Sequence, residues 1–361
     1  MSDIQIEVCN GVGMITLNRP KALNALSLPM IRELTAALLG WRDLDTVHAI
    51  AIRGHGKEGP FGAFCAGGDI RFFHQAGLSG DPRLEDFFTE EYSLNHLIHC
   101  YPKPYIAFHD GLVMGGGMGI SGHTRQGAKH RIVTERTKMA MPETNIGLFP
   151  DVGGGYFLSR CPGRTGEYLA LTGHMLGGVD ALQLGLADVM VDSGSLNDLW
   201  GEVARTGLVA LEHAQRSDTA GQSGALVAHR QQIDHFFGLA SVKEIIDALE
   251  ADDSKWATDT AGTLRQRSPL MLHVVLEQVR RGRSLGLADD LRMERDMVRN
   301  SFHLRPGAAS ETVEGVRALA VDKDHSPRWN PARIEDVTAD MWRAFFDSPW
   351  PAHAHPLRHL N

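Results

Sequence analysis

Two acidic side chains, Glu143 and Asp151, lie eight positions apart in a segment that ends in a glycine-rich turn and an apolar run. The segment, residues 142–158, reads PETNIGLFPDVGGGYFL. Carboxylates beside uncovered backbone amides can act as acids, bases or nucleophiles on a bound substrate. Each acid also has a structural interpretation, because Asp151 could cap a following helix and Glu143 could stabilise a first turn through the helix dipole.

Two glycine clusters accompany these acids. Residues 64–70 read FCAGGDI and residues 110–119 read DGLVMGGGMG, and each cluster follows a strand-like run, over 47–53 and 105–109 respectively. Glycine lets backbone N–H groups approach a ligand uncovered. Two such loops brought together form an oxyanion hole, which would stabilise the negative oxygen of a thioester or enolate transition state. The alternative is that both clusters are tight turns between strands and helices.

A third acid, Glu91, lies in a segment with helical spacing. Phe87, Leu94 and Ile98 fall at positions i, i+7 and i+11, and Glu91 falls at i+4 on the same apolar stripe. An ionised glutamate on an apolar face is costly unless it has partners or lines a cavity. Glu91 is therefore a candidate for substrate binding, with a salt bridge at the edge of the stripe as the alternative.

These motifs resemble those of the crotonase superfamily of acyl-CoA enzymes, and most closely those of its 3-hydroxyisobutyryl-CoA hydrolase branch. The resemblance covers nearly the whole chain. It begins at residues 15–26 (ITLNRPKALNAL), continues through both glycine clusters and the acidic segment, and ends at residues 314–327 (EGVRALAVDKDHSP). It implies an acyl-CoA thioester as the substrate and no cofactor, since CoA is part of that substrate.

The resemblance also implies a role for residues of each motif. Gly68 and Gly116 would donate backbone N–H bonds to the thioester oxygen. Glu143 would act as nucleophile or as base for water, and Asp151 would orient Glu143 or the water and help to protonate the leaving thiolate. Glu91 would hold the substrate hydroxyl or a water. The other residues implied in binding are Ala66, Asp69 and Ile70 for the substrate and Lys21, Ala22 and Leu23 for CoA.

The set of acids favours one branch of the superfamily. Its hydratases use two glutamates to handle one water, and at the position of the first this chain has Gly119, whereas the second matches Glu143. The hydrolase branch combines the second glutamate with an aspartate eight residues on, where this chain has Asp151. The resemblance therefore implies hydrolysis of a short branched β-hydroxyacyl-CoA, and among these it favours 3-hydroxyisobutyryl-CoA of valine catabolism. A hydratase or isomerase, or a non-catalytic paralogue, remains an alternative.

The pattern along the chain predicts an α/β protein. Residues 4–9 and 14–17 flank Asn10-Gly11, a hairpin signal, and strands then alternate with helices and glycine turns. After about residue 195 helical patterns dominate, for example over 242–249 and 270–281. The resemblance implies a crotonase spiral of ββα turns in residues 1–195, forming two roughly perpendicular sheets. Residues 196–361 would form a mainly helical region that packs on this core or on a neighbouring subunit of a homo-oligomer.

The composition limits the partners. A formal net charge of −8 gives no basic surface for nucleic acid or an anionic membrane. CoA is anionic, so a local basic patch is needed, for which Arg19, Lys21 and Arg71 are candidates. The four cysteines are scattered without a CxxC pair, and no HExxH occurs, so we expect reduced thiols and no metal site.

The start of the chain shows neither a secretion signal nor the Arg/Ser-rich presequence of imported mitochondrial proteins. No run approaches the ~20 apolar residues of a membrane span. We therefore expect a cytoplasmic enzyme.

Overall fold

The computed structural model describes residues 2–122, 129–207, 209–217, 219, 222 and 224–361. Its contacts divide the chain into two compact units, each assembled from three segments. The sheet unit comprises Met1–Gly68, Ser93–Ala140 and Met175–Ala228, and the helical unit comprises Asp69–Tyr92, Met141–His174 and His229–Asn361.

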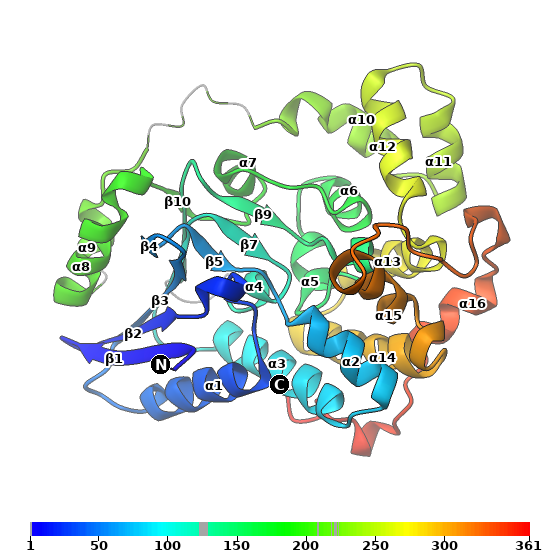
Figure 1. Cartoon of the computed structure of the whole chain (residues 1–361). Helices are drawn as coiled ribbons and strands as arrows, with labels where there is room; N and C mark the ends of the chain where they lie inside the picture. The colour runs from blue at the N-terminus through cyan, green and yellow to red at the C-terminus, as the bar shows by residue number, and fades with distance from the viewer. Residues whose placement is uncertain (1, 123–128, 208, 218, 220–221, 223) are drawn as a thin grey trace. The chain divides into compact units, whose positions relative to one another are not determined.

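A seven-stranded sheet forms the centre of the sheet unit (Figure 1). Its order is β1-β2-β3-β6-β8-β10, with β4 paired to β3. The expected hairpin at Asn10-Gly11 is confirmed: both residues have positive φ, 46° and 81°, and they join two antiparallel strands, whereas the later strands of the main path add in parallel. The strands are β1 (Ile4–Cys9), β2 (Val12–Leu17), β3 (Ala49–Gly56), β4 (Gly59–Pro60), β6 (Tyr105–His109), β8 (Lys129–Val133) and β10 (Val189–Met190).

A second, three-stranded sheet carries the glycine clusters. Its parallel strands, in the order β5-β7-β9, are β5 (Ala63–Cys65), β7 (Leu112–Met114) and β9 (Lys138–Ala140). Because β5 and β7 are parallel neighbours, the segments that follow them leave from the same edge of this sheet. The two glycine clusters are therefore brought side by side by strand pairing.

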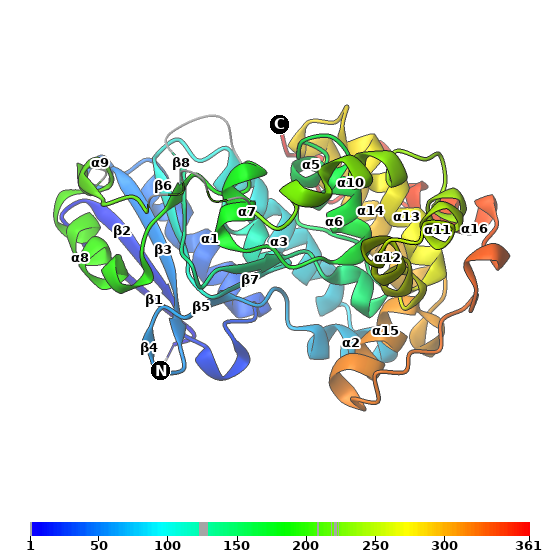
Figure 2. The same cartoon turned by 90° about the horizontal axis from the view of Figure 1, so that it is seen from above.

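Helices cover both faces of the larger sheet, so residues of both faces are buried. Met14 belongs to the face covered by α8, where it shares a buried cluster with Trp200. Gly13 faces α1, since a Cβ atom there would lie 2.6 Å from the Trp41 ring. Figure 2 shows α1 and α8 on opposite sides of the strands. The helices of this unit are α1 (Leu28–Arg42), α4 (Gly116–Gly119), α7 (Gly178–Gln183), α8 (Leu196–Thr206) and α9 (Val209–His213), and α3 (Arg83–His99) crosses from the helical unit.

The helical unit packs around a ring cluster in which Phe73 contacts Phe87 at 4.9 Å and Phe88 contacts Phe302 at 6.0 Å between ring centroids. Its helices are α2 (Ile70–Ser79), α5 (Gly154–Leu158), α6 (Thr165–Thr172), α10 (Arg230–Phe236), α11 (Val242–Glu250), α12 (Lys255–Arg265), α13 (Pro269–Gly282), α14 (Leu287–His303), α15 (Glu311–Val316) and α16 (Ala339–Arg343). Serine side chains cap the N-termini of four of them, namely Ser241, Ser254, Ser268 and Ser310.

Short helical turns connect these elements. They are η1 (Pro20–Ala22), η2 (Glu143–Ile146), η3 (Ser193–Ser195), η4 (Val227–His229), η5 (Gly307–Ala309), the π-helical η6 (Arg317–Val321), η7 (Ile334–Asp336), η8 (Ala344–Phe346) and η9 (Ala352–Ala354).

The helices predicted over 242–249 and 270–281 are confirmed by α11 and α13. In the described part of the chain no strand begins after Val189, which fits the expected change near residue 195. The division into regions 1–195 and 196–361 stays a prediction. None of the described helices combines the length and the apolar character needed to cross a bilayer.

Candidate active site

The three candidate acids belong to the helical unit, and all three are buried. Glu143 is the first residue of the turn η2, which follows Pro142, and its side chain is 7% exposed. Asp151 lies in the loop between η2 and α5 and is 6% exposed. Glu91 lies on α3 and is 2% exposed. The apolar stripe predicted from the sequence is therefore buried, and Glu91 is buried together with it.

Burial raises the pKa of all three acids, and the charge of Asp151 adds to the shift of the two glutamates. Burial raises the pKa of Glu91 well above its usual value, and the negative charges of Asp151 and Glu143 add to this. Burial, together with the charge of Asp151, also raises the pKa of Glu143 well above its usual value. Burial raises the pKa of Asp151 to about 7, against the hydrogen bond from Tyr92. Buried acids with strongly raised pKa values are typical of sites of acid–base chemistry.

Asp151 does not cap a helix. The Tyr92 hydroxyl donates to Oδ2 of Asp151 at 2.9 Å, and the N-cap of α5 is Gly153, which makes no side-chain capping bond. Burial and the charge of Asp151 raise the pKa of Tyr92, so its hydroxyl remains a donor. The capping interpretation is therefore wrong, and the carboxylate of Asp151 is oriented by a side chain.

The turn that carries Glu143 is closed by packing from α15. The Thr312 hydroxyl donates to the Gly147 carbonyl at 2.8 Å, and a Cβ atom on Gly315 would lie 2.3 Å from the Ile146 carbonyl carbon. Gly147 itself ends the turn with φ 64°. Oε2 of Glu143 is buried and has no hydrogen-bond partner among the described residues, so this oxygen is available to a substrate or a water.

The two glycine loops lie against each other in the sheet unit. A Cβ atom on Gly67 would lie 3.3 Å from the N atom of Gly116, and one on Gly117 would lie 2.5 Å from the Cys65 carbonyl oxygen. In the described part of the chain, no internal acceptor receives the N–H groups of Gly68 and Gly116. Two close, uncovered amides are what an oxyanion hole requires, and their catalytic role stays a prediction.

The segment expected to bind CoA is attached to the first glycine loop. Lys21 and Ala22 lie on η1, and Leu23 accepts a hydrogen bond from the Ala66 N–H at 3.0 Å. Leu26 donates to the Gly67 carbonyl at 2.8 Å, which extends this contact. Lys21, Ala22, Leu23, Ala66, Gly68 and Gly116 are thus gathered in one part of the sheet unit.

Asn24, which the sequence motifs did not single out, connects the segment expected to bind CoA to the strand that precedes the first glycine loop. Its buried Nδ2 donates to the carbonyls of Ala63 and Phe64 at 3.1 and 3.0 Å, and its Oδ1 accepts the Arg19 N–H at 2.8 Å. Asn24 also has φ 57°, a conformation that asparagine tolerates better than most residues. The available signal was an asparagine between alanine and leucine residues, where a polar amide has no reason to be buried unless it has partners.

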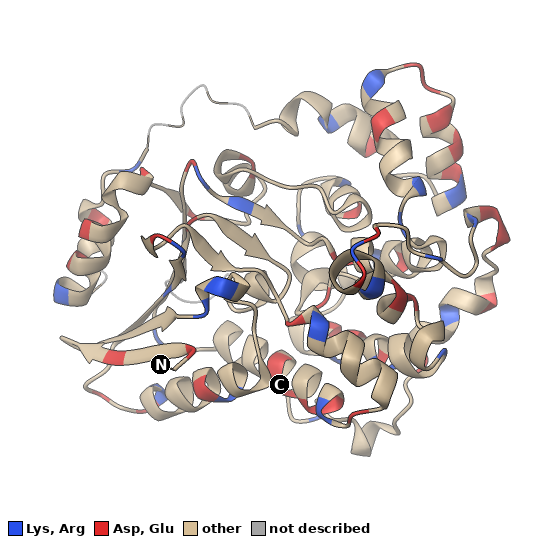
Figure 3. Ribbon diagram, in the orientation of Figure 1, with Lys and Arg blue, Asp and Glu red and all other residues tan. Residues whose placement is uncertain are grey.

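The remaining candidates lie at the start of the helical unit. Asp69 caps α2 by accepting the Phe72 N–H at 3.4 Å, and Ile70 is the first residue of that helix. Arg71, on α2, and Lys21, on η1, are exposed, and Figure 3 colours the basic residues of these elements blue. Their roles toward substrate and CoA stay predictions.

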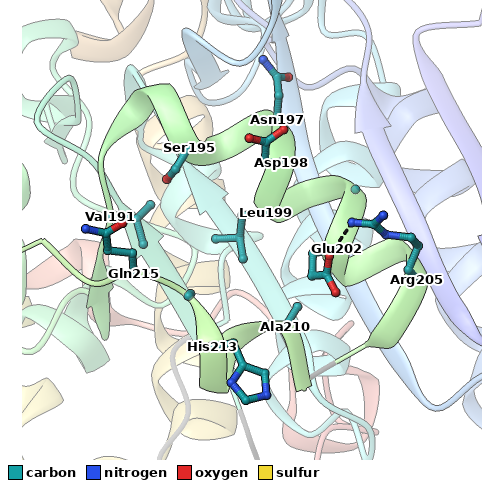
Figure 4. Close-up of a pocket in the computed structure, with 12 residues that line it drawn as sticks. Val191, Ser195, Asn197, Asp198, Leu199, Glu202, Arg205, Ala210, His213 and Gln215 are labelled. Atoms are coloured by element: carbon teal, nitrogen blue, oxygen red, sulfur yellow. Dashed lines mark hydrogen bonds and ion pairs between the residues drawn. The ribbon is translucent and has the colours of Figure 1, made fainter.

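A separate pocket of about 660 Å³ lies beside α8 and α9 in the sheet unit (Figure 4). Its lining includes Asp198, His213 and the ion pair between Glu202 and Arg205. None of the candidate catalytic residues lines it. Among the described residues no group of three His, Cys, Asp or Glu side chains is arranged to hold a metal ion.

The fold and these motifs define an acyl-CoA enzyme class. The chain belongs to the enoyl-CoA hydratase/isomerase family, which it matches over residues 12–346. Two solved structures share its fold. A carnitinyl-CoA dehydratase from Mycobacterium thermoresistibile has a TM-score of 0.89 and is 37% identical, covering 97% of this chain and 98% of its own. An enoyl-CoA hydratase from Rhodobacter sphaeroides 2.4.1 has a TM-score of 0.87, also at 37% identity, and covers 96% and 98%.

Several similar curated proteins have names that specify one reaction within this family. The mitochondrial 3-hydroxyisobutyryl-CoA hydrolase of Gallus gallus is 40% identical over 349 residues, which cover 94% of this chain and 87% of the relative. The probable 3-hydroxyisobutyryl-CoA hydrolase 3 of Arabidopsis thaliana is 38% identical over 366 residues, covering 96% and 92%. The expected α/β crotonase fold and the expected family are therefore confirmed.

Proposed function

We propose that this chain hydrolyses a short branched β-hydroxyacyl-CoA thioester, 3-hydroxyisobutyryl-CoA, to 3-hydroxyisobutyrate and CoA. The observation that carries the proposal is the buried pair of Glu143 and Asp151, with Asp151 oriented by Tyr92. The names of the curated relatives support the same reaction. The reaction falls within valine catabolism, which is the metabolic role we propose.

Each group of candidate residues contributes to a different step of this reaction. The N–H groups of Gly68 and Gly116 bind the thioester oxygen and stabilise its negative charge in the transition state. The Glu143 carboxylate then removes a proton from the water that attacks the carbonyl carbon, or attacks that carbon itself to form an anhydride that water hydrolyses to the free acid and the regenerated carboxylate. On either route the C–S bond breaks and the CoA thiolate leaves. Asp151, with a pKa of about 7, protonates the leaving thiolate of CoA. Glu91, whose pKa is raised by burial and by the charges of Asp151 and Glu143, holds the substrate hydroxyl or a water.

Hydration of an enoyl-CoA is the second candidate, because the two solved structures described above, each 37% identical, are named as a dehydratase and a hydratase. Against it, Gly119 occupies the position of the first hydratase glutamate and is the buried last residue of α4. Glycine has no group that could transfer the second proton of water. Hydrolysis needs only the acids that are present.

A panel of acyl-CoA substrates tests the proposal. The purified chain is incubated with 3-hydroxyisobutyryl-CoA, acetyl-CoA and crotonyl-CoA in the presence of a thiol reagent. We expect thiol release that is fastest with 3-hydroxyisobutyryl-CoA. Loss of enoyl absorbance without thiol release would assign a hydratase, and no reaction with any substrate would assign a non-catalytic protein.

Gly117 provides a test of the paired glycine loops. In Gly117→Ala the new Cβ would meet the Cys65 carbonyl at 2.5 Å, so the two loops must move apart. A displacement of about 1 Å at a reacting centre can cost on the order of a hundred-fold in rate, and we expect a loss of that size in kcat/KM. The control is Gly40→Ala on α1, where nothing lies within 4 Å, and which should keep full turnover. Unchanged turnover in Gly117→Ala would contradict the assignment.

The cellular location stays a prediction. The sequence predicts a cytoplasmic enzyme, whereas the vertebrate relatives are named mitochondrial. The oligomeric state expected from the resemblance also stays a prediction.

A further inference from the structure

The loop that carries Asp151 is held by two acids of α14. The N–H groups of Gly153 and Gly155 donate to Oε2 and Oε1 of Glu294 at 2.7 and 2.9 Å. The Tyr156 N–H donates to Oδ2 of Asp290 at 2.8 Å. Three N–H groups at the start of α5 thus donate to two carboxyl groups of one helix, which satisfy amides that the helix itself leaves without acceptors.

A glutamine of α13 forms hydrogen bonds on the other side of Asp151. Nε2 of Gln278 donates to the Pro150 carbonyl at 2.6 Å and to Oε1 of Glu294 at 3.0 Å. The residues immediately before and shortly after Asp151 are therefore both hydrogen-bonded to the Gln278–Glu294 pair. Asp151 itself points its carboxylate to Tyr92, so its backbone and its side chain are held by different partners.

The loop needs such support because its backbone is strained. Val152, a β-branched residue, has φ 55°, and Gly153 follows with φ 90°. A non-glycine residue, and a β-branched one above all, is unfavourable in this region and persists only where the surroundings hold it. The strained residue lies between Asp151 and the first amide bound by Glu294.

The two acids of α14 are ionisable side chains that are nevertheless completely buried. Asp290 and Glu294 are four residues apart on one helix and both are 0% exposed. Burial raises the pKa of Asp290 to about 7, and burial and the charge of Asp290 raise the pKa of Glu294. Both oxygens of Glu294 accept N–H bonds, whereas Oδ1 of Asp290 has no partner among the described residues.

We propose that Glu294 is a positioning residue for Asp151: with Asp290 and Gln278 it fixes the strained loop so that the Asp151 carboxyl group is held in its reactive place. This inference rests on the proposed function, because it explains these hydrogen bonds by a requirement of thioester cleavage. Burying an acid pair is costly, and well-packed apolar residues would stabilise α14 at least as well. The need to position the loop explains why Asp290 and Glu294 are acids, whereas the packing of α14 alone does not.

The test is Glu294→Gln, which preserves the shape of the side chain. An amide has only one acceptor oxygen, so one of the Gly153 and Gly155 N–H groups loses its partner. We expect kcat for thiol release to fall by about ten- to a hundred-fold, in keeping with the cost of a displaced catalytic group, while KM stays within a few-fold. The matched control is Asp296→Asn, a buried acid of the same helix that contacts Ser348 and His355 instead, and it should keep its kcat.

A double-mutant cycle separates positioning from general loosening. If Glu294 acts through Asp151, Glu294→Gln should lower kcat in the wild-type chain but change it by less than about three-fold in an Asp151→Asn chain, since the two effects are then coupled. Equal losses in both backgrounds would overturn the inference.

Amide hydrogen exchange gives a readout that does not depend on activity. Peptides covering residues 150–158 should exchange faster in Glu294→Gln than in the wild type and in Asp296→Asn. Unchanged exchange in this segment would overturn the inference even if the chain proved inactive. A wild-type chain that releases no thiol would instead overturn the proposed function.

Discussion

Replacing Glu143 by glutamine is expected to abolish thioester cleavage while leaving CoA affinity within a few-fold of the wild type. The amide nitrogen can neither attack a carbonyl carbon nor accept a proton from water, and Oε2 of Glu143 is buried without a hydrogen-bond partner among the residues that the structure describes. The residues expected to bind CoA, such as Lys21 and Leu23, belong to the sheet unit and are unchanged. Thiol release measures the first effect and calorimetric titration with CoA the second.

The Glu143→Gln chain should also fold. Burial raises the pKa of Glu143, so ionising it in the folded protein is unfavourable, and a neutral amide removes that cost. We expect an unfolding midpoint at neutral pH at least equal to that of the wild type. Near-normal turnover in a folded Glu143→Gln protein would exclude Glu143 as the reacting acid.

Replacing Asp151 by asparagine is expected to lower turnover by roughly a hundred-fold or more, the usual contribution of an acid–base group. The amide oxygen can still accept the Tyr92 hydroxyl, so the loop should keep its conformation. An asparagine cannot supply a proton to the leaving thiolate. A fully active Asp151→Asn protein would show that this acid has no part in catalysis.

The same substitution should change the pH dependence of stability. Burial raises the pKa of Asp151 from 3.8 to about 7, so the folded protein retains a proton that the unfolded chain has already lost. Folding stability from this group is therefore present at low pH and is lost as pH rises through about 7, because the unfolded state binds fewer protons there. We expect the stability of Asp151→Asn relative to the wild type to increase as pH rises from about 4 to about 7, as measured by thermal unfolding. A constant difference across this range would contradict the raised pKa.

The sequence by itself determined the local elements and the candidate chemistry. The Asn-Gly hairpin, the strand over 105–109 and the helices α11 and α13 follow from turn residues and periodicity, which act between near neighbours. The buried position of Glu91 followed from its place on an apolar stripe, because a helix brings residues i and i+4 to one face. The acids and the two glycine loops could be named because their residue types already limit what they can do.

Only the tertiary structure decided what holds those groups. Tyr92 reaches Asp151 across 59 residues, and Glu294 reaches Gly153 and Gly155 across 141 and 139 residues. In the sequence, Asp290 and Glu294 resemble the solvated acids of a charged helix, and nothing near them predicts that both are buried. Such pairings depend on how distant segments pack, and hydrogen bonds between distant residues leave no periodic signal in the chain. The position and the pKa of Asp151 are therefore properties of the packed helical unit.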